Sequence, residues 1–186
     1  MLDKTYRTEL LRTFLIDALP APLTAASSHV QIFDNYIANT RMRLRSIRVP
    51  ETREWKRILQ QRFPLSATEL SHWKIAEMQL DEGEHAQLEI FEGTEIRKNR
   101  YFHEYDSRMF AFDIYLGKLW GVNRARVDFQ NENELSGFRP PPFAVFEITN
   151  EPFFDDANLV EQTLESVREA VNRLKPASVA TAAPDQ

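Results

Sequence analysis

The chain has 186 residues, no cysteine and a formal net charge of −5. This length suits one domain, and the lack of cysteine excludes disulfides and thiolate metal sites and favours a reducing cytoplasm. The negative charge argues against general attraction to nucleic acid or to an anionic membrane. No apolar run approaches the ~20 residues that a membrane span needs, and the first residues lack the apolar core of a signal peptide. We therefore expect a cytoplasmic protein without a membrane segment.

Period-2 alternation is the main structural signal in the first half of the chain. After a break at 19–22, residues 31–37 have strand character, and 41–45 alternate strictly between arginine and apolar residues. This pattern puts Arg41, Arg43 and Arg45 on one face of a strand. Further strands are predicted over 55–63 and 73–80, followed by a short helix over 82–91.

The second half continues with strands and ends in a helix. Strands are predicted over 95–102, 109–116 and 123–129, and residues 143–149 alternate again after a proline-rich segment that cannot be a central strand. Apolar residues at helical spacing predict a helix over 158–174. Many strands and few helices predict an α+β barrel, with flanking helices and a C-terminal helix, rather than a doubly wound sheet. We expect this domain over residues 1–175 and a flexible tail over 176–186.

Charged residues recur on single faces of the predicted strands. Lys98 and Arg100 share a face, and so do Arg124, Arg126 and Asp128, of which we expect Arg124 to be exposed. A half-exposed sheet would place these charges in water. A closed barrel with an apolar outside and a polar lumen is the alternative. Basic side chains that converge in such a lumen would suit a polyanion.

An ordered series of short motifs resembles the CYTH family of triphosphate tunnel metalloenzymes. The resemblance runs from about residue 7 to 159 and rests on the following stretches: Tyr36-Ile37, Arg43-Leu44-Arg45, Lys98-Asn99-Arg100-Tyr101, Asp113, Gly117-Lys118-Leu119, Val127-Asp128-Phe129, Pro140-Pro141-Pro142-Phe143 and Glu147-Ile148-Thr149. The family implies a closed, mainly antiparallel β-barrel whose tunnel binds tripolyphosphate or a thiamine or nucleoside triphosphate. Its members hydrolyse such compounds with Mg²⁺ or Mn²⁺, and one branch cyclises ATP.

The resemblance implies three groups of site residues. Arg43, Arg45, Lys98, Arg100 and Arg126 would bind the phosphate oxygens. Glu77 and Asp113 would act as catalytic carboxylates, and Glu9, Asp128 and Glu147 would hold the metal.

The family's acidic metal-binding motifs are incomplete here. Its opening E-x-E-x-K motif matches Glu9, Leu11 and Thr13, so that one carboxylate and the lysine are missing. Its E-x-E partner motif reads Arg126-Val127-Asp128. Leucine cannot ligate a metal, and arginine would repel one, although three carboxylates remain.

Two hypotheses remain open on the sequence. The first is a triphosphate-binding enzyme or former enzyme, with weak or lost metal-dependent hydrolysis. The second is a non-catalytic nucleotide or polyphosphate sensor, or a scaffold for a protein partner. The sequence leaves open which triphosphate is bound and whether the chain forms a homodimer.

Overall fold

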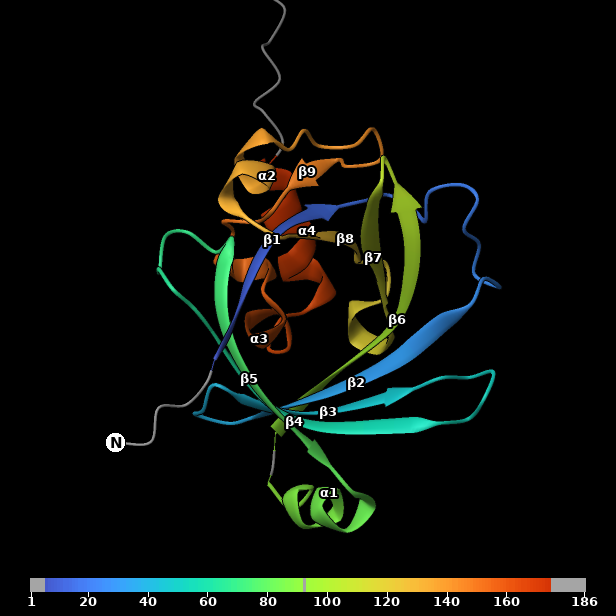
Figure 1. Cartoon of the computed structure of the whole chain (residues 1–186), viewed down its shortest axis with the longest axis vertical. Helices are drawn as coiled ribbons and strands as arrows, with labels where there is room; N and C mark the ends of the chain where they lie inside the picture. Colours follow the sequence, from blue (N-terminus) through green and yellow to red (C-terminus); the bar gives the residue numbers. More distant parts are fainter. Residues whose placement is uncertain (1–5, 92, 175–186) are drawn as a thin grey trace, which may run out of the picture.

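The computed structural model describes residues 6–91 and 93–174, and the predicted tail over 176–186 lies outside them. Within these residues, nine strands form one sheet (Figure 1). They are β1 (Arg7–Leu15), β2 (His29–Ile37), β3 (Met42–Arg48), β4 (Trp55–Pro64), β5 (His72–Leu80), β6 (Gly93–Tyr105), β7 (Arg108–Tyr115), β8 (Asn123–Phe129) and β9 (Phe146–Glu147).

The sheet closes on itself into a barrel. The strand order is β5-β4-β3-β2-β6-β7-β8-β1, and β1 also pairs with β5. Residues 7–10 of β1 pair with β5, residues 10–15 pair with β8, and every pairing is antiparallel. The short strand β9 adds to the end of β1. The predicted closed antiparallel barrel is therefore confirmed.

Most strands begin and end within two residues of the predicted bounds. Period 2 sets their faces, and tight turns set their register. The turn between β6 and β7 has only two residues, Asp106 and Ser107, and both have positive φ. Two such residues form the hairpin turn whose twist matches that of the flanking strands. Arg41, by contrast, precedes β3 and is exposed, so it does not share the buried face of Arg43 and Arg45.

The outer face of part of the barrel is apolar and covered. Phe14, Phe112, Ala125 and Val127 are almost fully buried there, with Leu135 of α2 (Glu132–Gly137) packed over them. The helix α1 (Glu82–Leu88) lies outside the barrel, against the outer surface of the sheet, at the bottom of Figure 1. A capping box formed by Asp81 and Glu84 starts it. Burial on the outer face leaves the inner face for polar side chains.

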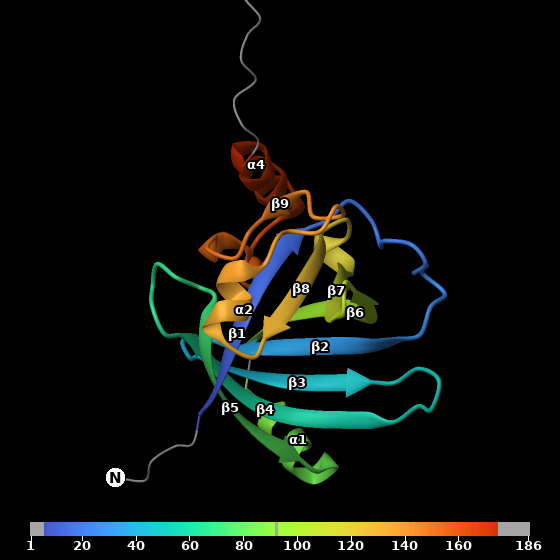
Figure 2. The ribbon, with the colours of Figure 1, turned by 45° about the horizontal axis from the view of Figure 1, so that its top comes forward.

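The chain after β9 packs against one end of the barrel (Figure 2). This part contains the short 3₁₀ turn η2 (Pro152–Phe154) and the helices α3 (Asp156–Leu159) and α4 (Leu164–Leu174). A second 3₁₀ turn, η1 (Gly117–Leu119), follows β7. Val167 of α4 and Leu159 of α3 share a buried apolar cluster with Tyr115 and Ile96 from the strands.

Three predicted elements were too long, and the first, the helix predicted over 82–91, ends at Leu88. The single helix predicted over 158–174 is wrong, because the Thr163 hydroxyl accepts a hydrogen bond from the Ser166 backbone amide and starts α4 anew. The strand predicted over 143–149 is reduced to two residues, although the Val145 and Ile148 amides still donate to β1. No helix of the described residues is long and apolar enough to cross a membrane.

Candidate functional site

An arginine-rich cavity occupies the lumen of the barrel. We call it the basic cavity, and the side chains that enter it leave a free volume of about 40 Å³. Six arginines and three carboxylates are among its lining residues: Arg43, Arg45, Arg62, Arg100, Arg124 and Arg126, with Glu151, Asp155 and Asp156.

Strand alternation points these arginines into the same space. Arg43 and Arg45 are two residues apart on β3, and so are Arg124 and Arg126 on β8, so each pair shares the inner face. Arg62 and Arg100 come from β4 and β6. Lys98, on the same face of β6 as Arg100, is 1% exposed and lies behind the cavity wall. Four of the five predicted phosphate-binding residues therefore line one cavity, and the fifth supports it.

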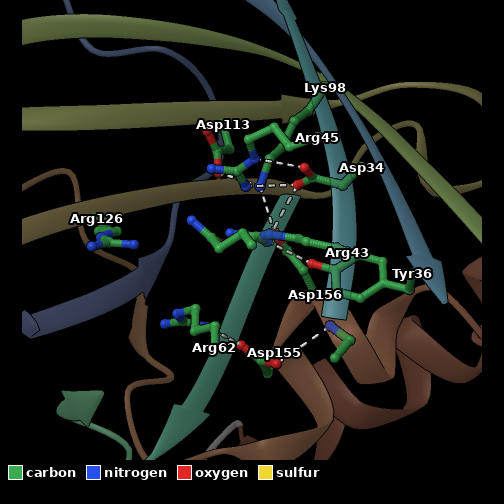
Figure 3. Close-up of polar contacts among 12 residues, drawn as sticks. Asp34, Tyr36, Arg43, Arg45, Arg62, Lys98, Asp113, Arg126, Asp155 and Asp156 are labelled. Atoms are coloured by element: carbon green, nitrogen blue, oxygen red, sulfur yellow. Dashed lines mark hydrogen bonds and ion pairs between the residues drawn. The ribbon is translucent and has the colours of Figure 1, made fainter. Parts of the chain in front are cut away.

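Asp34 of β2 anchors the two arginines of β3. The register places Asp34 opposite Arg45, whose Nε and Nη2 donate to the carboxylate at 2.6 and 2.7 Å, and Arg43 Nη1 donates at 3.3 Å (Figure 3). Arg43 also donates to the Tyr36 hydroxyl at 2.8 Å. Burial alone would raise the pKa of Asp34, but Arg43 and Arg45 outweigh burial and lower it to about 2. Asp34 is thus a fixed anion that orients both guanidinium groups.

Asp113 of β7 is a second buried carboxylate that orients guanidinium groups in the lumen. It accepts two hydrogen bonds from Arg100, at 2.6 and 2.8 Å, and lies 2.9 Å from Lys98 Nζ and 3.5 Å from Arg124. Burial opposes its ionisation, but the surrounding cations, Arg100 first, hold the pKa of this carboxyl well below its usual range. A carboxylate with so low a pKa is a poor proton acceptor.

Two further carboxylates come from the segment that follows β9. Asp156, at the start of α3, lies 2.5 Å from Lys98 Nζ and 2.8 Å from Arg124 Nη2, and the Tyr115 hydroxyl donates to it. Asp155 caps α3 and accepts from Arg62 at 2.8 Å. Asp156 stays ionised because Arg124, Lys98 and Arg43 outweigh its burial, so that its pKa lies well below the usual range.

Arginines outnumber carboxylates among the residues that line the cavity, while Asp34, Asp113, Glu9 and Asp128 pair with arginines of this group from outside the lining. Burial lowers the pKa of Arg62 to about 10, and Arg126 and Arg43 add to this effect while Asp155 opposes it. The Nε atoms of Arg43, Arg62 and Arg124 are buried, and among the described residues they have no hydrogen-bond partner. Buried donors without an acceptor are costly. The cavity therefore presents guanidinium groups, which bind oxyanions strongly.

Only two of the three predicted metal ligands, Glu9 and Asp128, lie near each other, and both pair with Arg126. Arg126 Nη2 lies 2.7 Å from both Glu9 and Asp128, so a guanidinium stands between these carboxylates. In Figure 3, Arg126 lies apart from the group formed by Asp34, Arg43 and Arg45. Glu147 pairs instead with Arg12, which is outside the cavity lining. In the part of the chain that the structure describes, no group of three or more acidic, histidine or cysteine side chains is placed to hold a metal ion. The residues present do not fit a divalent metal.

Glu77, the other predicted catalytic carboxylate, has partners that Asp113 does not share. It is exposed on β5, lies 3.6 Å from Arg7, and accepts a hydrogen bond from Gln60. Neither residue is among those that line the basic cavity. Their catalytic roles remain predictions.

The expectation that Arg124 is exposed was wrong. Arg124 shares the inner face of β8 with Arg126, and its Nη1 donates to the Phe154 carbonyl at 2.8 Å. The sequence reading also left Asp34, Arg62, Asp155 and Asp156 unassigned. Asp34 and Arg62 could have been found from strand alternation, since each falls on the inner face. No sequence pattern places the two aspartates, because they reach the lumen through packing of the segment after β9.

Comparison with known proteins establishes the fold. No family model and no curated protein matches the chain. Two crystal structures of NE1496 match, one described as a hypothetical protein (TM-score 0.57, 20% identity, covering 83% of this chain and 99% of that one). The other is described as an inorganic triphosphatase (TM-score 0.56, 22% identity, covering 83% and 95%). At these identities the likeness is one of fold, and the closed antiparallel barrel is the one that the sequence resemblance implied.

Proposed function

We propose that this chain binds a triphosphate-containing anion in the basic cavity. The observation that carries the proposal is the convergence of six guanidinium groups on one cavity. Guanidinium groups form strong, often bidentate hydrogen bonds with phosphate oxygens. NE1496, which has the same fold, is described as an inorganic triphosphatase, and this supports a triphosphate over a smaller anion.

The binding we propose needs no divalent metal. In a metal-dependent site, the cation screens the phosphates from the carboxylates that hold it. Here Arg126 pairs with both Glu9 and Asp128, and it lines the same cavity. Leu11 and Thr13 also line the cavity, and neither adds a carboxylate. Arg126 thus occupies the side of the lumen where metal ligands were expected.

Hydrolysis is weak or lost in this proposal. Attack of water on the terminal phosphorus is assisted by a group that accepts a proton near neutral pH. Asp113 is held in ion pairs with Arg100, Lys98 and Arg124, which lower its pKa and occupy its oxygens. The arrangement therefore favours binding over turnover, as in a sensor of the anion.

The test is calorimetry with tripolyphosphate and with ATP, in EDTA and in Mg²⁺, followed by a phosphate-release assay. We expect binding in EDTA, no gain in affinity with Mg²⁺, and little or no phosphate release. If neither compound binds under either condition, the proposal is wrong. Binding that requires Mg²⁺ and leads to rapid phosphate release would support a metal-dependent triphosphatase instead.

A further inference from the structure

The helix α1, outside the barrel (Figure 1), buries a histidine rather than an apolar side chain. Among the seven residues of α1, His85 alone is buried. Its Nε2 lies 3.0 Å from the hydroxyl oxygen of Ser46, on the outer face of β3. Its Nδ1 lies 3.3 Å from a carboxylate oxygen of Glu89, four residues along the chain. We call Ser46, His85 and Glu89 the outer triad, and the proposed anion binding uses none of its members.

The order of contacts in the outer triad is the one that a serine nucleophile needs. An imidazole with its proton on Nδ1 can donate a hydrogen bond to Glu89 and accept one from Ser46 at Nε2. In that tautomer, Nε2 is a base within hydrogen-bond distance of a hydroxyl nucleophile, and the carboxylate holds the ring in place. A hydrogen bond that only fastened α1 to the sheet would need neither the carboxylate nor open space beside the hydroxyl.

Open space does lie beside the hydroxyl, in a pocket that all three members of the outer triad line. Its free volume is about 370 Å³, which is within the range of small-molecule sites. Asn35 also lines it, diagonally across from Ser46 in the β2–β3 register, where such neighbours are about 7 to 8 Å apart. The Asn35 amide makes one long hydrogen bond, to the Phe91 carbonyl at 3.4 Å, and has a second N–H to offer. This N–H can stabilise negative charge that develops on a carbonyl oxygen at Ser46.

The walls of this pocket indicate the class of substrate. Phe33 and Leu44 supply apolar surface, and Glu89 and Glu95 are its charged lining residues. Glu95 pairs with Arg97, and among the described residues no lysine or arginine lines the pocket. An anionic substrate would find no cation in the walls, whereas an uncharged ester with an apolar acyl group would bury that group against them.

We infer that the outer triad is a second reactive site, at which Ser46 attacks the carbonyl carbon of an uncharged carboxylic ester. Ser46 Oγ bonds to the carbonyl carbon as its proton passes to His85 Nε2, and the alcohol leaves with that proton when the ester C–O bond breaks. Water then hydrolyses the acyl-serine, which releases the acid and restores the hydroxyl. Asn35 donates to the oxyanion, and Glu89 is a positioning residue that acts through His85. This chemistry does not depend on anion binding in the basic cavity.

The test is covalent labelling of the full chain with a fluorophosphonate, which phosphonylates a serine activated by a neighbouring base. Intact mass and peptide mapping give the extent and the position of the label. Labelling is followed in the wild type, Ser46→Ala, His85→Gln and Glu89→Gln, with folding checked by circular dichroism. Ser71→Ala is the matched control, because Ser71 also lies beside a histidine, His72 at 2.7 Å, but is not among the residues that line the pocket.

We expect one label per chain, on Ser46, in the wild type and in Ser71→Ala, and none in Ser46→Ala. His85→Gln should be labelled at least about 100-fold more slowly, because it lacks the general base. Ser46→Ala should also lose hydrolysis of p-nitrophenyl butyrate but bind tripolyphosphate as the wild type does, since Ser46 is not among the residues that line the basic cavity. No label on the wild type, a label at another serine, or an unchanged rate in folded His85→Gln would overturn the inference.

Glu89→Gln tests the positioning role. A carboxylate beside an imidazole stabilises the protonated ring, so the loss of this carboxylate should move half-maximal labelling to a lower pH. A slower rate without a shift in pH would show that Glu89 makes only a structural contact and has no part in the triad.

Discussion

At the scale of single residues, buried aspartates fix the positions of the basic side chains in the lumen. Asp34 and Asp113 each hold arginines by paired hydrogen bonds, and Asp156 joins Lys98 to Arg124. A buried charge without a partner is costly, so these pairs stabilise the fold only while both members are ionised. The same pairs hold the guanidinium groups in place before any ligand arrives, which reduces the entropy lost on binding.

Replacing Asp34 with asparagine should destabilise the protein in a pH-dependent way. Asp34 has a pKa lowered from 3.8 to about 2, so its contribution to stability is present above about pH 4 and is lost as the pH falls through about 2. At neutral pH, Asp34→Asn should cost about 3 kcal/mol of unfolding free energy, because Arg43 and Arg45 lose their buried anion. Urea unfolding of both proteins across this pH range measures the difference in their unfolding free energies.

The difference between the wild type and Asp34→Asn should shrink by roughly 2 kcal/mol between about pH 4 and about pH 2. If this difference in unfolding free energy stays constant over the range, then Arg43 and Arg45 do not lower the pKa of Asp34 in the folded state.

Restoring carboxylates at two positions should create a metal site. Leu11 and Arg126 line the same cavity near Glu9 and Asp128, so Leu11→Glu with Arg126→Glu would give four carboxylates in place of two and a guanidinium. We expect Mn²⁺ at about 100 times its Kd to stabilise this double variant by about 2.7 kcal/mol and to leave the wild type unchanged. Thermal unfolding with and without Mn²⁺ measures this effect.

Arg126→Gln is the control for the metal prediction, because it removes the cation without adding a carboxylate. Stabilisation of the wild type by Mn²⁺ to the same extent as the double variant would contradict our view that Arg126 excludes a metal.

The strands of the barrel show which structural features could be predicted from the sequence alone. Period-2 alternation predicted most strands and put Arg43 with Arg45, and Lys98 with Arg100, on the faces they occupy. It also put Arg126 beside Arg124, but a single strand does not say which face is inside, and so Arg124 was misjudged. The position of the segment after β9 could not be predicted from the sequence. Asp155 and Asp156 enter the lumen because α3 and α4 bury Leu159 and Val167 at the end of the barrel, and such long-range packing leaves no local pattern.

The segment after β9 should limit anion affinity through Asp155. Asp155→Asn removes one of the three lining carboxylates and frees Arg62, while asparagine remains a good cap for α3. We expect tripolyphosphate to bind about tenfold more tightly in calorimetry. Asp81→Asn, the same change at the cap of α1 on the outside of the barrel, should leave affinity unaltered. Unchanged or weaker binding by Asp155→Asn would argue against a charge-driven site.

The pairing of β2 with β6 depends on a glycine. A Cβ atom at Gly93 would lie 2.2 Å from the Tyr36 carbonyl oxygen, so Gly93→Ala must push the two strands apart. We expect a fall in Tm of about 3 to 10 °C in thermal unfolding. Gly137→Ala in α2 is the matched control, because nothing lies within 4 Å of its added Cβ, and it should be neutral or slightly stabilising. Equal effects of the two changes would contradict the close contact.

At the scale of the whole molecule, closure of the barrel explains how an acidic protein can hold a concentrated basic site. The formal charge is −5, yet six arginines face one enclosed space. The sequence motifs, the closed antiparallel sheet and the likeness to NE1496 agree on the fold. The same sequence also showed in advance that the acidic motifs were incomplete. What it could not show is how the remaining carboxylates pair, since this depends on which side chains meet across the lumen.

The most direct test of the anion site uses two arginines of β6 that face opposite ways. Arg100 lines the basic cavity, whereas Arg97 is exposed and pairs with Glu95. Arg100→Ala leaves Asp113 paired with Lys98 and Arg124, so the fold should survive. In calorimetry with tripolyphosphate in EDTA, we predict that Arg100→Ala weakens binding by about 10- to 100-fold and that Arg97→Ala binds as the wild type does. Equal affinity of the folded Arg100→Ala variant and the wild type would contradict the account.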